Sequence, residues 1–111
     1  MRYVCRHAAA IICHAGFGTV LHALVSGIPT LLLPSHLEQS LTTRNAARLG
    51  IGRAVASDAQ DPDFASLLHA LLDTSDATAK ARALADKYAG FDQDQAMVTL
   101  ARRCEELAGS L

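Results

Sequence analysis

The sequence lacks an excess of charge of either sign. Its 111 residues carry 10 Lys and Arg against 11 Asp and Glu, which gives a formal net charge of −1, and only 19% of the residues are charged. This balance provides no basic surface for nucleic acid and no acidic tail, so we expect no nucleic-acid partner. Half of the residues are apolar, which suffices for one domain with one modest core.

Long apolar runs are also missing. The longest ones read AAAIIC and IPTLLLP, and both are far shorter than the roughly 20 residues that span a bilayer. No charged leader with a small-residue cleavage site precedes them. We therefore expect a cytoplasmic protein with no transmembrane segment.

Cysteine is scarce and irregularly placed. The three cysteines, Cys5, Cys13 and Cys104, are odd in number and include no C-x-x-C pair. This argues against a disulfide framework and against a zinc site. We expect three reduced thiols, with Cys13 and Cys104 in the core.

What is present is an alternation of short apolar runs and helical patterns. Residues 8–13 and 30–33 read as strands buried on both faces, although a run as short as the first also fits a helix segment. Between them a helix of about two turns is predicted, ended by Gly27, with an apolar face of Val20, Leu21, Leu24 and Val25. Residues 38–49 predict a second helix, ended by Gly50, and residues 52–57 a third strand.

Three helices are predicted after that strand, with no further strand between them. The first starts with Asp61 as cap and Pro62 in the first position, and its apolar stripe is Phe64, Leu67, Leu68, Leu71 and Leu72. The second carries Ala81, Leu84, Ala85 and Tyr88 on one face and ends near Gly90. The third places Met97, Leu100, Ala101, Cys104 and Leu107 on one face, and this face needs an apolar partner, for which the two preceding helices are the nearest candidates.

The order strand, helix, strand, helix, strand predicts an α/β fold with a parallel sheet and right-handed crossovers. Three strands are fewer than the usual five or six of a doubly wound sheet. A sheet of this size leaves a strand edge uncovered. We therefore expect residues 1–111 to form a single partial domain, cut from a longer chain or completed by a partner.

The stretch ICHAGFGT, residues 12–19, is placed at the carboxyl end of the first strand, where open α/β sheets bind ligands. Gly16 and Gly18 permit a tight turn and close approach, and the helix that follows offers N–H groups to a phosphate. Thr19 can cap that helix or bond a phosphate oxygen, and His14 can donate a ring N–H. The same residues also fit a plain turn before a capped helix, and both interpretations stay open at this point.

A dinucleotide-binding module is a minor alternative. The G-x-G-x-x-G pattern needs a small residue where Leu21 stands. Glu38 follows Gly18 by 20 residues, near the distance of a ribose-binding acid, but it lies past Pro34 and so in the loop beyond the strand. A P-loop is excluded, because the sequence has no Gly-Lys-Ser/Thr.

Residues 11–52, IICHAGFGTVLHALVSGIPTLLLPSHLEQSLTTRNAARLGIG, resemble the donor-binding segment of GT-B glycosyltransferases of the UDP-glycosyltransferase type. The markers occur in order: HAGxGT, a small-residue helix, GxP, a strand ending in proline, an acid followed by glutamine, and an Asn-Ala pair. The resemblance implies the second half of a GT-B C-terminal domain. That is a partial Rossmann-like sheet of about three strands with helices on both faces and a helical C-terminus.

The resemblance also implies roles for individual residues in binding a nucleotide sugar, a UDP- or dTDP-sugar, with no cofactor and no metal. The diphosphate would be bound by His14, Gly16, Gly18 and Thr19, and the sugar hydroxyls by Glu38 and Gln39. A carboxylate accepts from two adjacent hydroxyls, whereas an amide both donates and accepts. The implied reaction is transfer of a hexosyl group to an acceptor hydroxyl.

Other parts of such an enzyme find no counterpart in the sequence. The family binds the nucleotide base with residues about 20 positions before the histidine, and its acceptor domain supplies the general base. The catalytic residues are therefore unknown; candidates by residue type alone are His7, His22, His36 and His69. We expect a glycosyltransferase that is inactive as the isolated chain. Its expected partner is a missing N-terminal acceptor domain or another chain. The resemblance also implies that the last helix would reach the surface of that missing domain.

Two alternatives to a free-standing enzyme remain at this stage. The chain fits a non-catalytic subunit whose donor site is completed by a partner. It also fits a structural remnant that self-associates through its open sheet, in which case a homodimer is expected.

Overall fold

The computed structural model describes residues 2–56, 58–74 and 76–110, and within them three short strands form one parallel sheet in the order β1-β2-β3. The strands are β1 (Ile11–Cys13), β2 (Thr30–Leu32) and β3 (Gly52–Ala54). The helices are α1 (Arg2–Cys5), α2 (Phe17–Ser26), α3 (Leu37–Leu49), α4 (Phe64–His69), the π-helical turn η1 (Ala70–Thr74), α5 (Ala77–Lys87) and α6 (Gln93–Gly109). This confirms the predicted α/β fold with three parallel strands.

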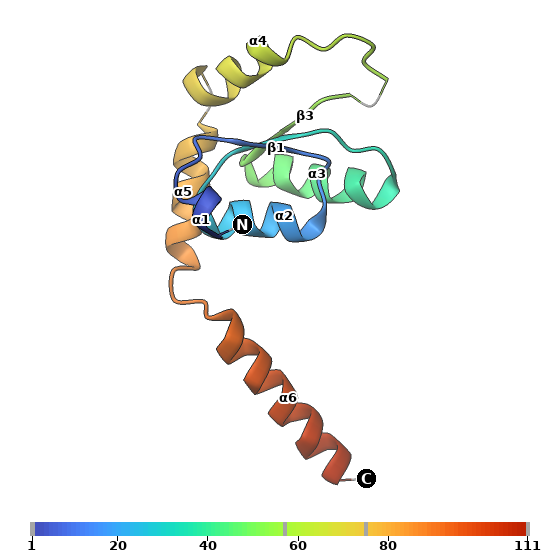
Figure 1. Cartoon of the computed structure of the whole chain (residues 1–111). Helices are drawn as coiled ribbons and strands as arrows, with labels where there is room; N and C mark the ends of the chain where they lie inside the picture. The colour runs from blue at the N-terminus through green and yellow to red at the C-terminus, as the bar shows by residue number, and fades with distance from the viewer. Residues whose placement is uncertain (1, 57, 75, 111) are drawn as a thin grey trace.

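The central strand β2 carries the core on both faces of the sheet. Leu31 and Leu32 are fully buried, and successive side chains of a strand point to opposite faces. Leu32 belongs to a cluster on the side of α2, α3 and α5, together with Ala15, Val20, Ala46, Ile51 and Ala81. Leu31 belongs to a second cluster, on the side of α4 and η1, together with Val55, Leu71 and Ala77. Figure 1 shows α4 above the strands and α2 and α3 below them, so helices cover both faces as predicted.

Glycines end α2 and α3 at the predicted positions. Gly27 and Gly50 have φ of 73° and 74°, a left-handed conformation that glycine adopts without steric cost. A Cβ at Gly27 would lie 3.2 Å from the Cβ of Ala85. This glycine therefore also allows the close packing of α5 against α2.

Helix α2 buries only part of the predicted face, since Val20 is buried and Leu24 packs against the core cluster. It spans ten residues instead of about two turns, and its buried residues are Val20 and Ala23. Leu21 and Val25 are exposed. A helix on so small a sheet turns only a narrow stripe toward the strands, so half of the predicted apolar face has nothing to pack against.

The boundaries of the strands and of α4 also differ from the prediction. Strand β1 is limited to Ile11–Cys13 and β3 to Gly52–Ala54, and Ser57, the last residue of the predicted third strand, lies outside the described residues. The cap of α4 is Asp63, not Asp61. The Asp63 carboxylate accepts hydrogen bonds from the Ser66 hydroxyl at 2.6 Å and the Ser66 N–H at 3.0 Å. These bonds lower the pKa of Asp63.

The cysteines are free thiols. Of the two that were predicted in the core, Cys13 packs against the cluster that contains Leu32, whereas the prediction for Cys104 is wrong. Cys5 is buried, in the short helix α1 that the sequence pattern did not indicate. Cys13 is half-buried and Cys104 is exposed. Cys104 is exposed because its helix does not pack on the domain.

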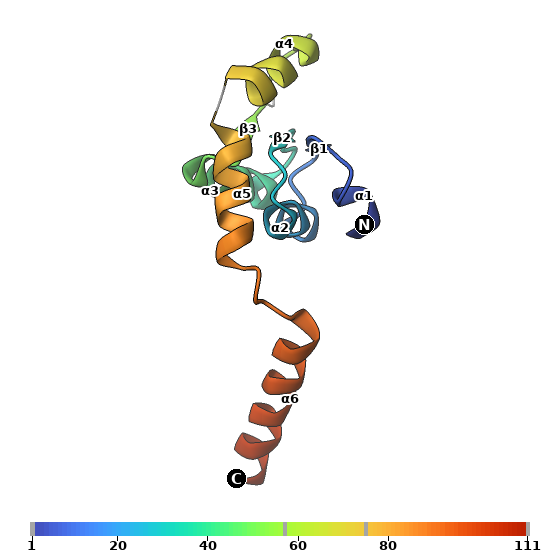
Figure 2. The same cartoon turned by 90° about the vertical axis from the view of Figure 1, so that its left-hand side faces the viewer.

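Helix α6 extends away from the rest of the chain (Figures 1 and 2). All of its residues are exposed, including Met97 and Leu100 at 58% and 57%. The two preceding helices, which were the nearest candidates for a partner of this apolar face, therefore do not pack against it. Those helices already turn their apolar residues to the sheet, since Leu71, Ala77 and Ala81 belong to the two core clusters. The other candidate, the surface of a missing domain, stays a prediction.

Among the described residues, none of the helices has both the length and the apolar character needed to span a membrane.

We expect the substitution Leu100→Asp to change the free energy of unfolding by less than about 0.5 kcal/mol, because the side chain is exposed. Leu32→Asp is the matched control and should destabilise by about 3 kcal/mol or more, since it buries an unpaired charge. Urea denaturation of both variants measures the difference. A large loss of stability in Leu100→Asp would mean that α6 packs on the domain in solution.

Candidate functional site

Strand pairing brings three loops to the same edge of the sheet. Cys13 pairs with Leu32, and the N–H of Leu33 donates to the Cys13 carbonyl at 2.9 Å. On the other side of β2, the N–H of Val55 donates to the Leu32 carbonyl at 2.8 Å. The connections that follow β1, β2 and β3 all lie on the right-hand side of Figure 1. This carboxyl edge is where open α/β sheets bind ligands.

His14 directly follows β1, and its exposed ring is oriented by the neighbouring loop. Its Nδ1 lies 3.1 Å from the carbonyl oxygen of Leu33. A carbonyl only accepts, so Nδ1 carries a hydrogen and donates it. Nε2 is thereby left for a ligand: it accepts in the neutral ring and donates when the ring is protonated.

The turn after His14 is made by Ala15, not by the glycines to which the sequence pattern assigned it. Ala15 has a φ of 65°, and it is the one non-glycine residue with positive φ in the described ranges. This conformation costs an alanine about 1 kcal/mol. The side chain of Ala15 is 1% exposed and belongs to the core cluster under α2, and this packing holds the turn.

Gly16 and Gly18 are required neither by the backbone conformation nor by packing. Gly16 has a φ of −60°, and Gly18 is not among the residues with positive φ. A Cβ built at either position would meet nothing within 4 Å. The space beside both residues is open, so their effect is to leave the backbone accessible at the start of α2.

The start of α2 offers uncapped backbone N–H groups. Gly16 is the N-cap and makes no side-chain hydrogen bond. Thr19 is the third residue of the helix, so it does not cap the helix, which was one of its two predicted roles. The first N–H groups of a helix have no acceptor within it. Together with the positive end of the helix dipole, the N–H groups of Phe17, Gly18 and Thr19 suit an anion such as phosphate.

The loop after β2 leads into α3 and is ordered by Gln39. Its Oε1 accepts hydrogen bonds from the N–H and the hydroxyl of Ser35, at 2.8 and 2.9 Å. The accepting side of this amide is therefore occupied, and only its NH2 group is left for a ligand. Glu38 is exposed and forms no salt bridge with any described residue.

A cavity of about 330 Å³ opens at this edge. It is lined by His14, Leu33, Pro34, Ser35, Val55, Ala56, Ala59, Pro62 and Phe64, and so by all three loops. Of the five histidines, only His14 lines it. The sequence reasoning missed the contribution of the loop after β3, although its place after the third parallel strand was the signal that could have indicated it.

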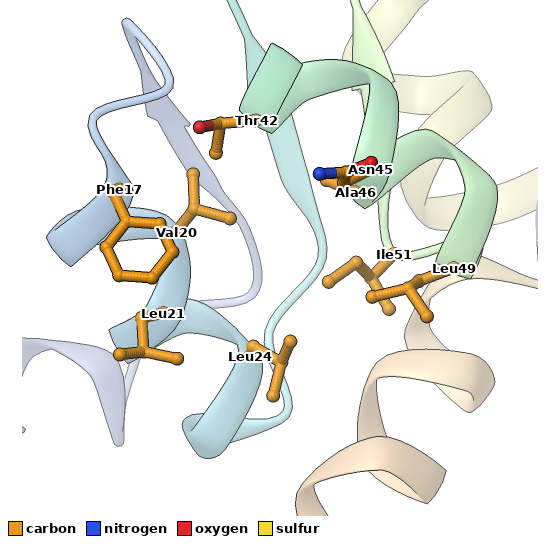
Figure 3. Close-up of a pocket in the computed structure, with 9 residues that line it drawn as sticks. All are labelled: Phe17, Val20, Leu21, Leu24, Thr42, Asn45, Ala46, Leu49 and Ile51. Carbon is orange, nitrogen blue, oxygen red and sulfur yellow. The ribbon is translucent and has the colours of Figure 1, made fainter. Parts of the chain in front are cut away.

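A second, smaller groove of about 190 Å³ lies between α2 and α3 (Figure 3). Phe17, Leu21 and Leu24 line it from α2, Leu49 from the end of α3, and Ile51 from the connection to β3. Its polar lining is limited to Thr42 and Asn45. Since it contains neither a charged side chain nor a histidine, this groove offers no chemistry comparable to that of the cavity beside His14.

Residues 1–107 match the family described as "Erythromycin biosynthesis protein CIII-like, C-terminal domain". The chain belongs to this family. The resemblance to the C-terminal part of a GT-B glycosyltransferase is thus confirmed by a match over nearly the whole chain.

Curated relatives agree with this family. The chain is 40% identical over 77 residues to vancomycin aglycone glucosyltransferase of Amycolatopsis orientalis, and the match covers 69% of this chain and 18% of that protein. It is 42% identical over 66 residues to glycosyltransferase GtfE of the same organism, covering 60% of this chain and 16% of that protein. The chain thus matches less than a fifth of the length of either relative.

The structure of glycosyltransferase VinC in complex with dTDP superposes with a TM-score of 0.80 at 23% identity, covering 95% of this chain and 27% of that one. The structure of spinosyn forosaminyltransferase SpnP superposes with a TM-score of 0.79 at 24% identity, covering 97% of this chain and 28% of that one. Both likenesses show that the fold is shared.

We expect Gly18→Ala to raise the free energy of unfolding by about 0.4–1 kcal/mol, because the helical backbone at Gly18 suits alanine and the added methyl has space. The same substitution should weaken binding of inorganic pyrophosphate, since the methyl covers the start of α2. Gly27→Ala is the control and should destabilise, because its φ is 73°. Thermal unfolding and calorimetric titration measure the two effects. A Gly18→Ala variant that binds pyrophosphate unchanged would contradict the role of this backbone.

Proposed function

We propose that the chain is the donor-binding part of a glycosyltransferase, which binds the diphosphate and the sugar of a UDP- or dTDP-sugar for hexosyl transfer to an acceptor hydroxyl. The observation that carries this proposal is the meeting of His14, the uncapped start of α2 and the start of α3 at one edge of the sheet. Family membership of residues 1–107 supports it, and so does the complex of the structural neighbour VinC with dTDP.

The diphosphate is assigned to the first loop. Two phosphate groups lie against the N–H groups of Gly18 and Thr19, with the Thr19 hydroxyl as a further donor. His14 supplies Nε2, which in the protonated ring donates to a phosphate oxygen. These donors also stabilise the diphosphate as charge develops on it during departure from the sugar. Because Gly16 and Gly18 leave open space, the phosphates reach the backbone directly.

The sugar is assigned to Glu38 and Gln39 at the start of α3. The Glu38 carboxylate accepts hydrogen bonds from two neighbouring hydroxyls. Because Oε1 of Gln39 accepts hydrogen bonds from Ser35, this amide acts on the sugar as a donor through its NH2 group. The Gln39 side chain therefore has two tasks: it orders the loop and it orients a sugar oxygen.

No residue of the chain is assigned as the general base. His7 lies against Tyr3, with ring centroids 5.0 Å apart, and His69 is paired with Asp73 at 3.0 Å. His22 and His36 are exposed, and none of these four histidines lines the cavity beside His14. We assign the acceptor and its base to the portion of a glycosyltransferase that this chain does not match.

We expect a titration with UDP or dTDP to shift the backbone amide signals of His14, Gly18 and Thr19 in NMR spectra, and His14→Ala to weaken binding by about tenfold or more. His22→Ala, an exposed position on α2, is the control and should bind as the unaltered chain does. Shifts confined to α4–α6 would contradict the assignment. A mass that rises with concentration and does not respond to nucleotide would favour the self-associating remnant.

We expect the chain alone to show no sugar transfer. Positioning of the acceptor hydroxyl beside a base accounts for up to about 7–11 kcal/mol of barrier reduction in favourable cases, and no residue here is assigned to it. The assay combines several nucleotide sugars with hydroxylated acceptors, without and with an added GT-B N-terminal fragment. Transfer only with the fragment supports a partner-completed site. Turnover by the lone chain would contradict the proposal, and its loss in His36→Ala would identify the recruited base.

A further inference from the structure

We propose that the residues after β3 that line the cavity, namely Val55, Ala56, Ala59, Pro62 and Phe64, form a wall of the sugar subsite, and that the ring of Phe64 packs against the apolar face of the donor sugar. This inference rests on the proposed function. Its starting point is the cavity beside His14, one wall of which consists of residues that follow the motif segment 11–52 and that no motif assigned to the site.

The size of the cavity indicates which share of the donor it holds. Pockets for small ligands span about 300–1,000 Å³, and this cavity of about 330 Å³ lies at the low end. It has space for one part of a nucleotide sugar, not for the whole molecule. Since His14 lines it and is assigned to the diphosphate, that part is directly attached to the diphosphate.

The second loop indicates on which side of the diphosphate the cavity lies. Ser35 lines the cavity, and both its N–H and its hydroxyl are bonded to Oε1 of Gln39. Gln39 is assigned to the sugar. The cavity therefore lies on the sugar side of the diphosphate and not on the nucleoside side.

The wall that faces the two loops is apolar and offers few donors. Its side chains are Val55, Ala56, Ala59, Pro62 and Phe64. The N–H groups of Val55, Ala59 and Phe64 already donate to the carbonyls of Leu32, Ala56 and Pro62, at 2.8, 3.1 and 2.9 Å. If the sugar turned a face rich in hydroxyls to this wall, those hydroxyls would find no N–H donor. The ring therefore turns carbon–hydrogen bonds to this wall and hydroxyls to Glu38 and Gln39.

Phe64 is held in place by the start of α4. It is the first residue of that helix, directly after the cap Asp63, whose carboxylate is bonded twice to Ser66. The side chain of Phe64 is still 43% exposed. An aromatic ring on a fixed backbone with an open face is suited to contact a sugar without a large ordering cost.

The test compares nucleotide sugars with the bare nucleotides on the full chain, by calorimetric or NMR titration. Phe64→Ala should weaken binding of UDP-glucose or dTDP-glucose by about three- to tenfold, the range for loss of part of one aromatic contact. Binding of UDP or dTDP should change by less than about twofold. Phe64→Leu should restore most of the lost affinity, because it restores apolar contact.

Phe91→Ala is the matched control, since Phe91 is also exposed, at 58%, and lies in the connection before α6; it should bind both kinds of ligand unchanged. Equal losses for nucleotide and nucleotide sugar in a folded Phe64→Ala variant, or no loss for either, would overturn the role of Phe64 and leave the proposed function intact. Failure of the unaltered chain to bind any of these ligands would overturn the proposed function and this inference with it.

Discussion

Strand β2 holds the fold together, because it pairs with a parallel strand on each side and buries both of its faces. Leu31 and Leu32 have no exposed surface, and each belongs to a different core cluster. Helices α2 and α3 pack on the cluster of Leu32, α4 packs on that of Leu31, and α5 contributes to both. Parallel pairing also has a consequence for function: it places the ends of all three strands, and the loops after them, at a single edge. His14, Ser35 and Val55 come from those three loops and line one cavity.

In the first loop, one residue makes the turn and two others leave the backbone accessible to a ligand. Ala15 takes the unfavourable left-handed conformation and is held by its buried methyl group. Gly16 and Gly18 are then free of any structural demand and leave the backbone accessible. A conformation that costs free energy is maintained where core packing compensates for it, directly beside the groups proposed to bind the diphosphate. Stability and ligand access are thus provided by different residues of one short motif.

Much of the fold could be predicted, because its signals are local. The apolar run at residues 30–33 and the glycines at 27 and 50 specify a buried strand and two helix ends through chemistry within a few residues. Boundaries were less predictable: Asp61 and Asp63 are equally good caps in sequence, and only the hydrogen bonds to Ser66 distinguish them. The candidate site was likewise predictable only where its residues form a local pattern. Its first two loops were predicted by residue type and resemblance, whereas the wall after β3 consists of ordinary apolar residues with no recognisable pattern.

Periodicity, turn residues and a motif in a fixed order suffice to predict the parallel sheet, the family and the order of the elements after α1, the short helix that no pattern indicated. Which apolar faces are buried depends instead on contacts between distant segments. The stripes on α5 and α6 look alike in sequence, but Ala77 and Ala81 of α5 are in the core and Met97 and Leu100 of α6 are exposed. Periodicity shows that a helix has an apolar face but not whether a partner surface is within reach, and here the sheet is already covered by the helices that precede α6.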